Sequence, residues 1–135
     1  MNLDLAITPG TGIPIFRQIV DQIRLAAATG GLKAGTALPS VRALAERLVI
    51  NPNTVAKAYS ELARERVIET QQGKGVFIAA PRQMYTKTER LRRLAPLLDS
   101  VAVEGLSLGF STQELIEALR QKLASMSDSS RRASS

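Results

Sequence analysis

Apolar residues recur every three to four positions in three stretches of the N-terminal half, and this spacing predicts three amphipathic helices. The first stretch begins at Pro14, which suits the first turn of a helix, and ends at a Gly-Gly pair. The second follows Ser40 and the third follows Asn51, both favoured N-cap residues. Between these two helices, Val49 and Ile50 form the turn. The residues expected to face the core are Ile15, Phe16, Ile19, Val20 and Ile23; Val41, Leu44, Ala45 and Leu48; and Val55, Ala58, Tyr59 and Leu62.

Two short β-rich runs, residues 67–70 and 76–79, follow the third helix and predict a hairpin. The glycines of the intervening Gln71-Gln72-Gly73-Lys74-Gly75 permit positive φ in the turn. Residues 32–38 are expected to form a connector. Two short helices followed by a glycine-tipped hairpin are the plan of a winged helix-turn-helix.

A second helical region is predicted beyond Pro81. Residues 85–104 carry an apolar stripe, and Pro96 within this run is expected to kink or split the helix. Residues 105–110 predict a break, and Ser111-Thr112-Gln113-Glu114 matches a capping box that starts another helix. The two apolar stripes consist of Leu91, Leu94, Leu98 and Val101, and of Leu115, Ile116, Leu119 and Leu123.

These elements predict an α+β fold that is mostly α. The expected organisation is a winged helix-turn-helix domain at residues 8–80 and a short two-helix dimerisation tail at residues 81–126. Residues 127–135 are rich in Ser and Arg and are expected to be disordered.

The net charge of +6 favours a polyanionic partner such as nucleic acid. Residues 1–80 and residues 81–135 each hold nine Lys and Arg against six Asp and Glu, so bulk charge does not locate the contact surface. No apolar run approaches the roughly 18 to 20 residues of a membrane span, and the N-terminus does not resemble a signal peptide. These features and the absence of Cys indicate a cytoplasmic protein without a membrane partner.

The chain contains neither Cys nor His, which excludes thiolate or imidazole metal sites and Cys-His or Ser-His nucleophile pairs. No cofactor, metal or catalytic residue is therefore predicted, and the chain is not expected to be an enzyme. A carboxylate enzyme using Glu61, Glu65 and Glu69 is the alternative, but glutamates spaced by four usually form a solvated face.

The start of the third helix carries polar residues suited to the major groove, which the first turns of a recognition helix enter. Asn53 can offer a bidentate amide to adenine, Thr54 can contact a phosphate or a thymine methyl, and Lys57 lies one turn on. Arg42, at the start of the preceding helix, can reach a phosphate or a guanine. Asn51 is compatible with both capping and DNA contact. The competing interpretation is that Asn51 and Asn53 only cap and Lys57 is a solvated charge.

The hairpin tip has two interpretations. A phosphate-binding P-loop requires a longer glycine-rich pattern that opens a helix, whereas here a strand follows Gly75. A wing that contacts a minor groove or a phosphate through Gln72 and Lys74 fits the sequence better.

Four segments of the chain are distinctive when taken together: Pro14-Ile15-Phe16-Arg17-Gln18-Ile19, Leu38-Pro39-Ser40-Val41-Arg42, Asn51-Pro52-Asn53-Thr54-Val55 and Gly73-Lys74-Gly75-Val76-Phe77. They resemble the GntR family of bacterial transcription regulators, and the short helical tail resembles its YtrA-type subfamily. The resemblance covers roughly residues 8–126. The resemblance implies a homodimer that binds an operator, often as a repressor. It also implies DNA contacts from Arg42, from Asn51 to Thr54, and from Gln72 and Gly73.

Two positions depart from the family pattern. Arg66 stands where the family commonly has a glycine suited to a left-handed helix end, so strain or a different helix end is expected there. Phe16 stands where the family often has tyrosine. The tail is too short for the metabolite-binding or aminotransferase-like domain of larger relatives, so an effector pocket of that kind is not expected, and any small-molecule effector is unknown.

The leading hypothesis is a sequence-specific transcriptional regulator that binds a palindromic double-stranded DNA operator as a homodimer. The alternative is a winged-helix protein-interaction module without sequence-specific DNA binding. The apolar stripes of the tail are expected to form the dimer interface, because they are too apolar to leave in water. Packing of the stripes against the chain's own winged domain is the competing interpretation.

Overall fold

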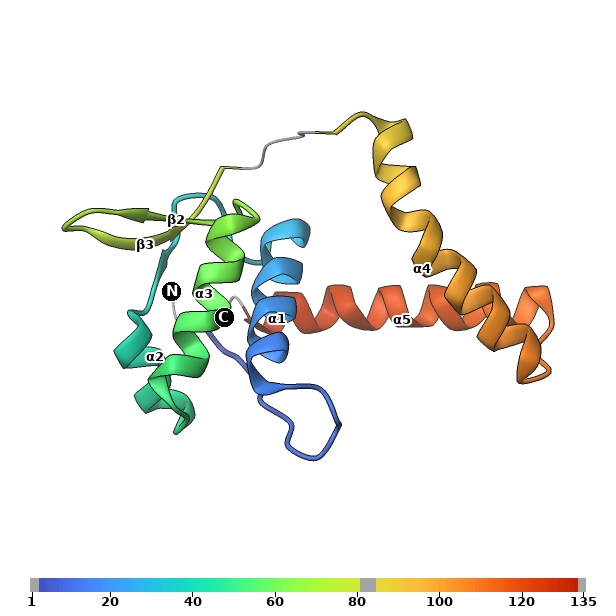
Figure 1. Cartoon of the computed structure of the whole chain (residues 1–135), viewed down its shortest axis with the longest axis horizontal. Coiled ribbons are helices and arrows are strands. Elements are labelled where there is room, and N and C mark those ends of the chain that lie inside the picture. The colour runs from blue at the N-terminus through green and yellow to red at the C-terminus, as the bar shows by residue number, and fades with distance from the viewer. Residues whose placement is uncertain (1–2, 81–84, 134–135) are drawn as a thin grey trace. The chain divides into compact units, whose positions relative to one another are not determined.

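The computed structural model describes residues 3–80 and 85–133. The chain divides into two compact units, one that runs to Pro81 and includes the residues from Ser127, and one that spans Arg82–Met126. The first unit contains three helices and a small sheet, and the second contains one long helix and most of another (Figure 1). This confirms the predicted mostly α fold with a winged helix-turn-helix. In the part of the chain that the structure describes, no helix is long and apolar enough to cross a membrane.

The three predicted helices of the first unit are confirmed as α1 (Ile15–Thr29), α2 (Val41–Leu48) and α3 (Pro52–Arg64). Local interactions explain where these helices begin and end. The Ser40 hydroxyl accepts the Ala43 N–H at 3.0 Å and caps α2. At the end of α1, Gly30 adopts φ 82°, a left-handed conformation that glycine accepts at little cost.

The turn between α2 and α3 is tight and its backbone is strained. Val49 ends α2 in the left-handed region at φ 56° and ψ 52°, where a β-branched side chain is unfavourable. The next N–H, that of Ile50, donates to the Ala45 carbonyl at 3.0 Å. The Val49 side chain is 87% exposed, so no burial of apolar surface offsets this strain.

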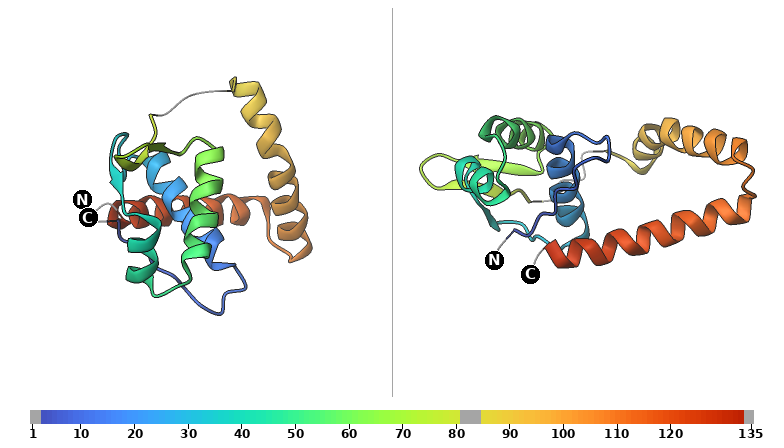
Figure 2. Two further views of the ribbon diagram at one scale, coloured as in Figure 1. Left: turned by 60° about the vertical axis from the view of Figure 1, so that its left-hand side comes forward. Right: turned by 90° about the horizontal axis from the view of Figure 1, so that it is seen from below.

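A three-stranded antiparallel sheet completes the winged domain. Its strands are β1 (Ala37–Leu38), β2 (Ile68–Gln71) and β3 (Gly75–Ile78), in the order β1-β3-β2. The hairpin prediction is confirmed with each strand displaced by one residue. The first strand was not predicted, because its two residues cannot display an alternating pattern and it forms by pairing with β3. In both figures the β2–β3 hairpin projects away from the three helices (Figures 1 and 2).

The core of the winged domain lies where α1, α2 and α3 meet the sheet. Helix α3 packs against both α1 and α2, and β2 packs against α3. The expected core positions that are at most 6% exposed are Ile19, Val20, Ile23, Leu44, Ala45, Val55, Ala58, Tyr59 and Leu62. Tyr59 keeps its hydroxyl satisfied in this core by donating to the Pro39 carbonyl at 2.8 Å, and burial raises its pKa.

The extended segment before α1 is attached by two glutamines one helical turn apart. The Gln18 amide accepts the Thr8 N–H at 2.8 Å and donates to the Thr8 carbonyl at 3.0 Å. The Gln22 amide makes the same reciprocal pair with Ala6, at 3.0 and 2.7 Å. These side chains substitute for a neighbouring strand, which satisfies the backbone of a segment outside the sheet.

The second unit contains α4 (Lys87–Ser107) and most of α5 (Thr112–Ala133), up to Met126. Helix α4 continues through Pro96, so of the two outcomes expected for this proline, a split is wrong and a kink stays a prediction. The capping box at the start of α5 is confirmed. The Ser111 N–H donates to the Glu114 carboxylate at 2.8 Å, and the Glu114 N–H donates to the Ser111 hydroxyl at 3.1 Å. Hydrogen bonds that the Glu114 carboxylate accepts from Ser111, first from its backbone N–H and second from its side chain, lower the pKa of Glu114.

The C-terminal residues differ from the sequence expectation of a disordered tail. Helix α5 continues from its apolar stripe to Ala133, and residues 134–135 lie outside the described residues. The segment contains no proline or glycine, so nothing in it ends the helix, and an existing helix adds residues more easily than a new one forms.

The C-terminal end of α4 and the N-terminal end of α5 are in close contact at Gly105 and Leu115. Gly105 is the one buried residue of α4, and a Cβ placed on it would lie 2.3 Å from Cδ2 of Leu115. Apart from this contact, the second unit leaves its large apolar side chains exposed. Those that are at least 41% exposed are Tyr85, Leu91, Leu94, Leu97, Leu98, Val101, Val103, Leu106, Leu108, Phe110, Ile116, Leu119, Leu123 and Met126.

Candidate nucleic-acid interface

The beginning of α3 presents a polar surface. Asn51 caps the helix, since its side-chain oxygen accepts the Asn53 N–H at 2.8 Å. That leaves the Asn51 amide nitrogen available to another acceptor. The Asn53 side chain is exposed, whereas Thr54 is partly buried. The first turn of α3 therefore offers two exposed side-chain amides, which can read bases or contact phosphates.

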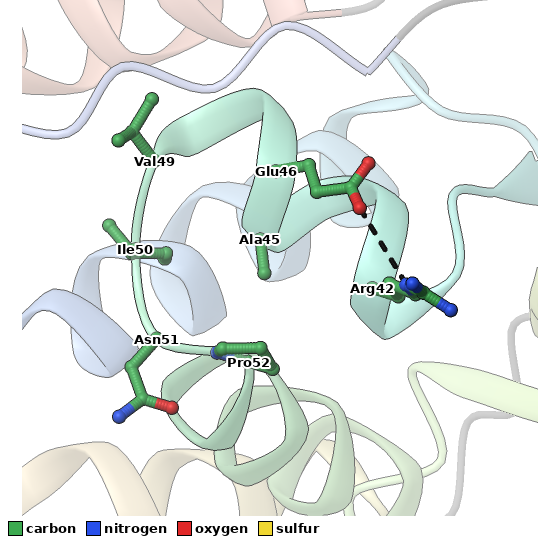
Figure 3. Close-up of a pocket in the computed structure, with 7 residues that line it drawn as sticks. All are labelled: Arg42, Ala45, Glu46, Val49, Ile50, Asn51 and Pro52. Atoms are coloured by element: carbon green, nitrogen blue, oxygen red, sulfur yellow. Dashed lines mark ion pairs between the residues drawn. The ribbon is translucent and has the colours of Figure 1, made fainter.

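Arg42 lies in the first turn of α2 and is almost fully exposed. Its Nε lies 3.6 Å from Oε1 of Glu46, one turn further along the same helix. Both residues border a shallow hollow of about 580 Å³ between α2 and the start of α3 (Figure 3). Asn51 borders the same hollow, so the structure brings two of the predicted contact residues together.

Lys57 has an intramolecular partner that the sequence analysis did not foresee. Its Nζ lies 4.0 Å from the centre of the Phe16 ring, an arrangement typical of a cation–π interaction. The guanidinium of Arg17 approaches the same ring, at 5.1 Å. The Phe16 ring therefore connects α1 to α3.

Glu61 of α3 and Glu65, the C-cap residue of that helix, form ion pairs with α1. The Arg17 guanidinium contacts both carboxylate oxygens of Glu61, at 2.9 and 3.1 Å, and the Glu61 side chain is 20% exposed. Arg24 likewise contacts both oxygens of Glu65, and this hydrogen bonding raises the pKa of Arg24. The interpretation as a solvated face is wrong for Glu61, which is largely covered and faces Arg17, whereas Glu65 and Glu69 are exposed as expected. The two ion pairs fix the position of α3, and this pairing gives the carboxylate-enzyme alternative no support.

The hairpin tip is fully accessible. Gln72, Gly73 and Lys74 form a three-residue connection between paired Gln71 and Gly75, and all are exposed. Gly73 and Gly75 have φ angles of 79° and 115°, so glycine is required for the shape of this tip. A strand follows rather than a helix, which excludes the phosphate-binding loop considered from the sequence.

Arg66 adopts the left-handed backbone conformation that a glycine would adopt at this position. Its φ is 63°, immediately beyond the end of α3. The expected strain is therefore present, and it does not disturb the hairpin. The Val67 N–H still donates to the Leu62 carbonyl at 2.9 Å, and β2 begins at Ile68.

Sequence reasoning missed two residues that act on predicted contact residues. Glu46 pairs with Arg42, and its spacing of four residues on one helix was a usable sign. Phe16 contacts Lys57, but the two residues are distant in sequence, so no local pattern pointed to their contact.

The comparison with known proteins follows this geometry. The sequence model of bacterial regulatory proteins of the gntR family matches residues 15–78, from α1 to the end of β3. The HTH-type transcriptional repressor YtrA of Bacillus subtilis (strain 168) is 33% identical over 117 residues, which cover 87% of this chain and 90% of that protein. The chain belongs to the GntR family. This member of the family is accordingly a DNA-binding transcriptional regulator and not an enzyme.

Solved structures extend the similarity of this GntR protein beyond the winged domain. A transcriptional antiterminator from Listeria monocytogenes EGD-e is 32% identical, with a TM-score of 0.84 over 93% of this chain and 94% of that one. YtrA from Sulfolobus acidocaldarius, a GntR-family transcription factor, is 30% identical, with a TM-score of 0.53 over 90% of this chain and 97% of that one. The coverage includes the helical tail, consistent with the YtrA type.

Proposed function

We propose that this GntR protein is a cytoplasmic repressor that binds a two-fold symmetric operator as a homodimer. The observation that carries the proposal is the exposed polar start of α3, bordered by exposed Arg42. A helix of this kind fits the major groove. The name of the Bacillus relative, a transcriptional repressor, supports repression. Repression also requires the least of the protein, since a regulator that covers a promoter needs no activity beyond DNA binding.

The proposed DNA contacts divide into base readers and phosphate contacts. Arg42, Asn53 and Thr54 are assigned to base edges and the adjoining backbone, and Asn51 adds a contact through its free amide nitrogen. At the wing, Gln72, Gly73 and Lys74 are assigned to the backbone or minor groove. Lys57 is assigned to a phosphate only, because its ammonium lies over the Phe16 ring and not at the first turn of α3.

Dimerisation is proposed through α4 and α5. The predicted interface residues Leu91, Leu94, Leu98, Ile116, Leu119 and Leu123 are 44 to 56% exposed, whereas Leu115 packs on Gly105 within one copy. So large an apolar surface needs a partner. A second copy supplies a complementary surface by symmetry and places two recognition helices about one DNA turn apart, so that two modest half-site energies combine.

The alternative function, a protein-interaction module, predicts a different response to salt. A DNA-binding surface that neutralises several phosphates loses affinity steeply as salt rises, through release of counterions. Binding to a protein through a polar helix face depends less on salt.

The test is selection of bound sequences from a pool of random duplexes, followed by affinity measurements on the selected duplex and a scrambled duplex. Asn53→Ala or Arg42→Ala should weaken binding to the selected duplex about tenfold or more, since a bidentate base contact is worth roughly 1 to 3 kcal/mol. Lys74→Ala is the matched control: it should weaken both duplexes about equally and lower the salt slope by roughly one. Folded Arg42 and Asn53 variants that retain full affinity would exclude this assignment.

A further inference from the structure

The pair formed by Arg42 and Glu46 lies on the proposed DNA-facing surface rather than in the protein interior. The side chains are 89% and 73% exposed, and Nε of Arg42 lies 3.6 Å from Oε1 of Glu46. Figure 3 shows both on α2, on one side of the hollow that the start of α3 also borders. A carboxylate in this position faces any DNA strand that approaches Arg42.

Helix stability does not explain this arrangement. Arg42 occupies the first turn of α2, near the positive end of the helix dipole, and Glu46 occupies the last turn, near the negative end. Each charge is thus at the unfavourable end of the helix, and the order Arg before Glu is the weaker one for a pair four residues apart. The reversed pair would stabilise α2 more.

We propose that Glu46 is a specificity-determining residue that orients Arg42 and repels the phosphates of unrelated DNA. The proposal rests on the proposed function, in which Arg42 contacts DNA. The carboxylate lies nearest to Nε of Arg42, which leaves the four N–H groups of the two terminal nitrogens free. These form the planar fork that binds guanine O6 and N7.

The same carboxylate acts against non-specific binding. A phosphate that enters the hollow by charge alone meets Glu46 at close range, and that repulsion is not compensated when the bases are wrong. At the right sequence, Arg42 gains its base contact and keeps its Glu46 partner. The two effects together widen the difference between operator and random DNA.

Two substitutions separate these effects. Glu46→Gln removes the charge but keeps the length and an oxygen that faces Nε, so binding to a scrambled duplex should strengthen about fivefold while binding to the selected duplex changes little. Glu46→Asp keeps the charge but withdraws the oxygen by one methylene. Binding to the selected duplex should then weaken about fivefold, with little change for the scrambled duplex.

The matched control for charge is Asp21→Asn. Asp21 is an exposed carboxylate on α1 that lies 4.0 Å from Arg24, and its removal changes the net charge by the same amount. It should leave the ratio of the two affinities unchanged. A second control places Glu46→Asp in an Arg42→Ala background, where orientation of Arg42 no longer matters and the aspartate should have no effect. Thermal melts of all variants monitor folding.

The outcomes are distinct. A scrambled-duplex affinity that Glu46→Gln leaves unchanged overturns the repulsion, and a selected-duplex affinity that Glu46→Asp leaves unchanged overturns the orientation of Arg42. An equal effect of Glu46→Asp with and without Arg42 also overturns it. Failure of the proposed function is recognised separately, because the unsubstituted protein would then select no sequence and bind both duplexes alike.

Discussion

The winged domain and the α4–α5 hairpin contain similar apolar stripes, but the stripes are buried in the first and exposed in the second. In the winged domain, Ile19, Val55 and Leu62 are fully buried. In the hairpin, Leu94, Leu98 and Leu119 remain 44 to 48% exposed, and α4 buries only Gly105. The first unit encloses its own core, whereas the second has one tight contact and an uncovered face.

The difference shows that an apolar stripe predicts a helix and its buried face, but not what covers that face. Helices of the winged domain cover one another because α3 packs on both α1 and α2. Two helices alone cannot enclose residues on all of their apolar positions. The contrast therefore separates folding, which the winged domain completes, from assembly, which we assign to the hairpin.

Removal of the α4–α5 hairpin should have the largest effect on DNA binding. A chain ending at Pro81 should remain folded, because its core is complete, and should sediment as a monomer. Its affinity for the selected duplex should fall about a hundredfold or more, since linkage of two sites raises apparent affinity by roughly 10² to 10⁴. A truncated chain that still sediments as a dimer would place the interface in the winged domain and contradict the comparison.

Matched leucine truncations should separate core from interface. Leu62→Ala removes a fully buried side chain and should lower the free energy of unfolding of the winged domain by about 2 to 5 kcal/mol. Leu98→Ala, at 46% exposure, should leave the unfolding of that domain unchanged and weaken dimerisation instead. Denaturant unfolding and sedimentation of the full chain measure the two quantities for each variant. If both substitutions lowered the free energy of unfolding of the winged domain equally, the distinction between core and interface would be wrong.

The stability of the α4–α5 hairpin should depend on the contact between Gly105 and Leu115. Gly105→Ala places a methyl group 2.3 Å from Cδ2 of Leu115, so the leucine must leave its position. The cost should be about 1 to 3 kcal/mol, as for overpacking elsewhere, less the gain in helix propensity. Adding Leu115→Ala should relieve the clash, so the double variant should be more stable than the sum of the single changes. Additive effects in thermal melts would show that the contact does not matter.

A small gain in stability is expected in the winged domain itself. Val49→Asn should raise its free energy of unfolding by about 0.5 to 1 kcal/mol, because asparagine tolerates the left-handed conformation and Val49 buries little apolar surface. Val49→Ala removes the β-branch but keeps Cβ, so its gain should be smaller. Thermal melts of the truncated chain measure both, and a loss of stability with asparagine would mean that Val49 is not strained.

The local elements of this protein were predictable because their causes are local. Pro14, Ser40, Asn51 and Ser111 mark helix starts whether or not the rest of the chain is folded. The caps at Ser40, Asn51 and Ser111 are hydrogen bonds within two or three residues. The glycine-tipped hairpin follows from backbone preferences alone. The candidate contact residues were likewise predictable in position, since a helix start and a turn tip fix where their side chains stand.

The tertiary structure decided what those side chains touch. Strand β1 exists only because β3 lies beside it, and Glu61 lost its expected solvation because α1 brings Arg17 within 2.9 Å. Lys57 is held over Phe16 by the same packing. Such contacts join residues some forty positions apart, and their energies depend on distances of a few ångströms that no spacing along one helix encodes. The sequence by itself determined which faces were apolar and which were polar, while only packing in three dimensions decided which charges are paired and which apolar surface remains uncovered.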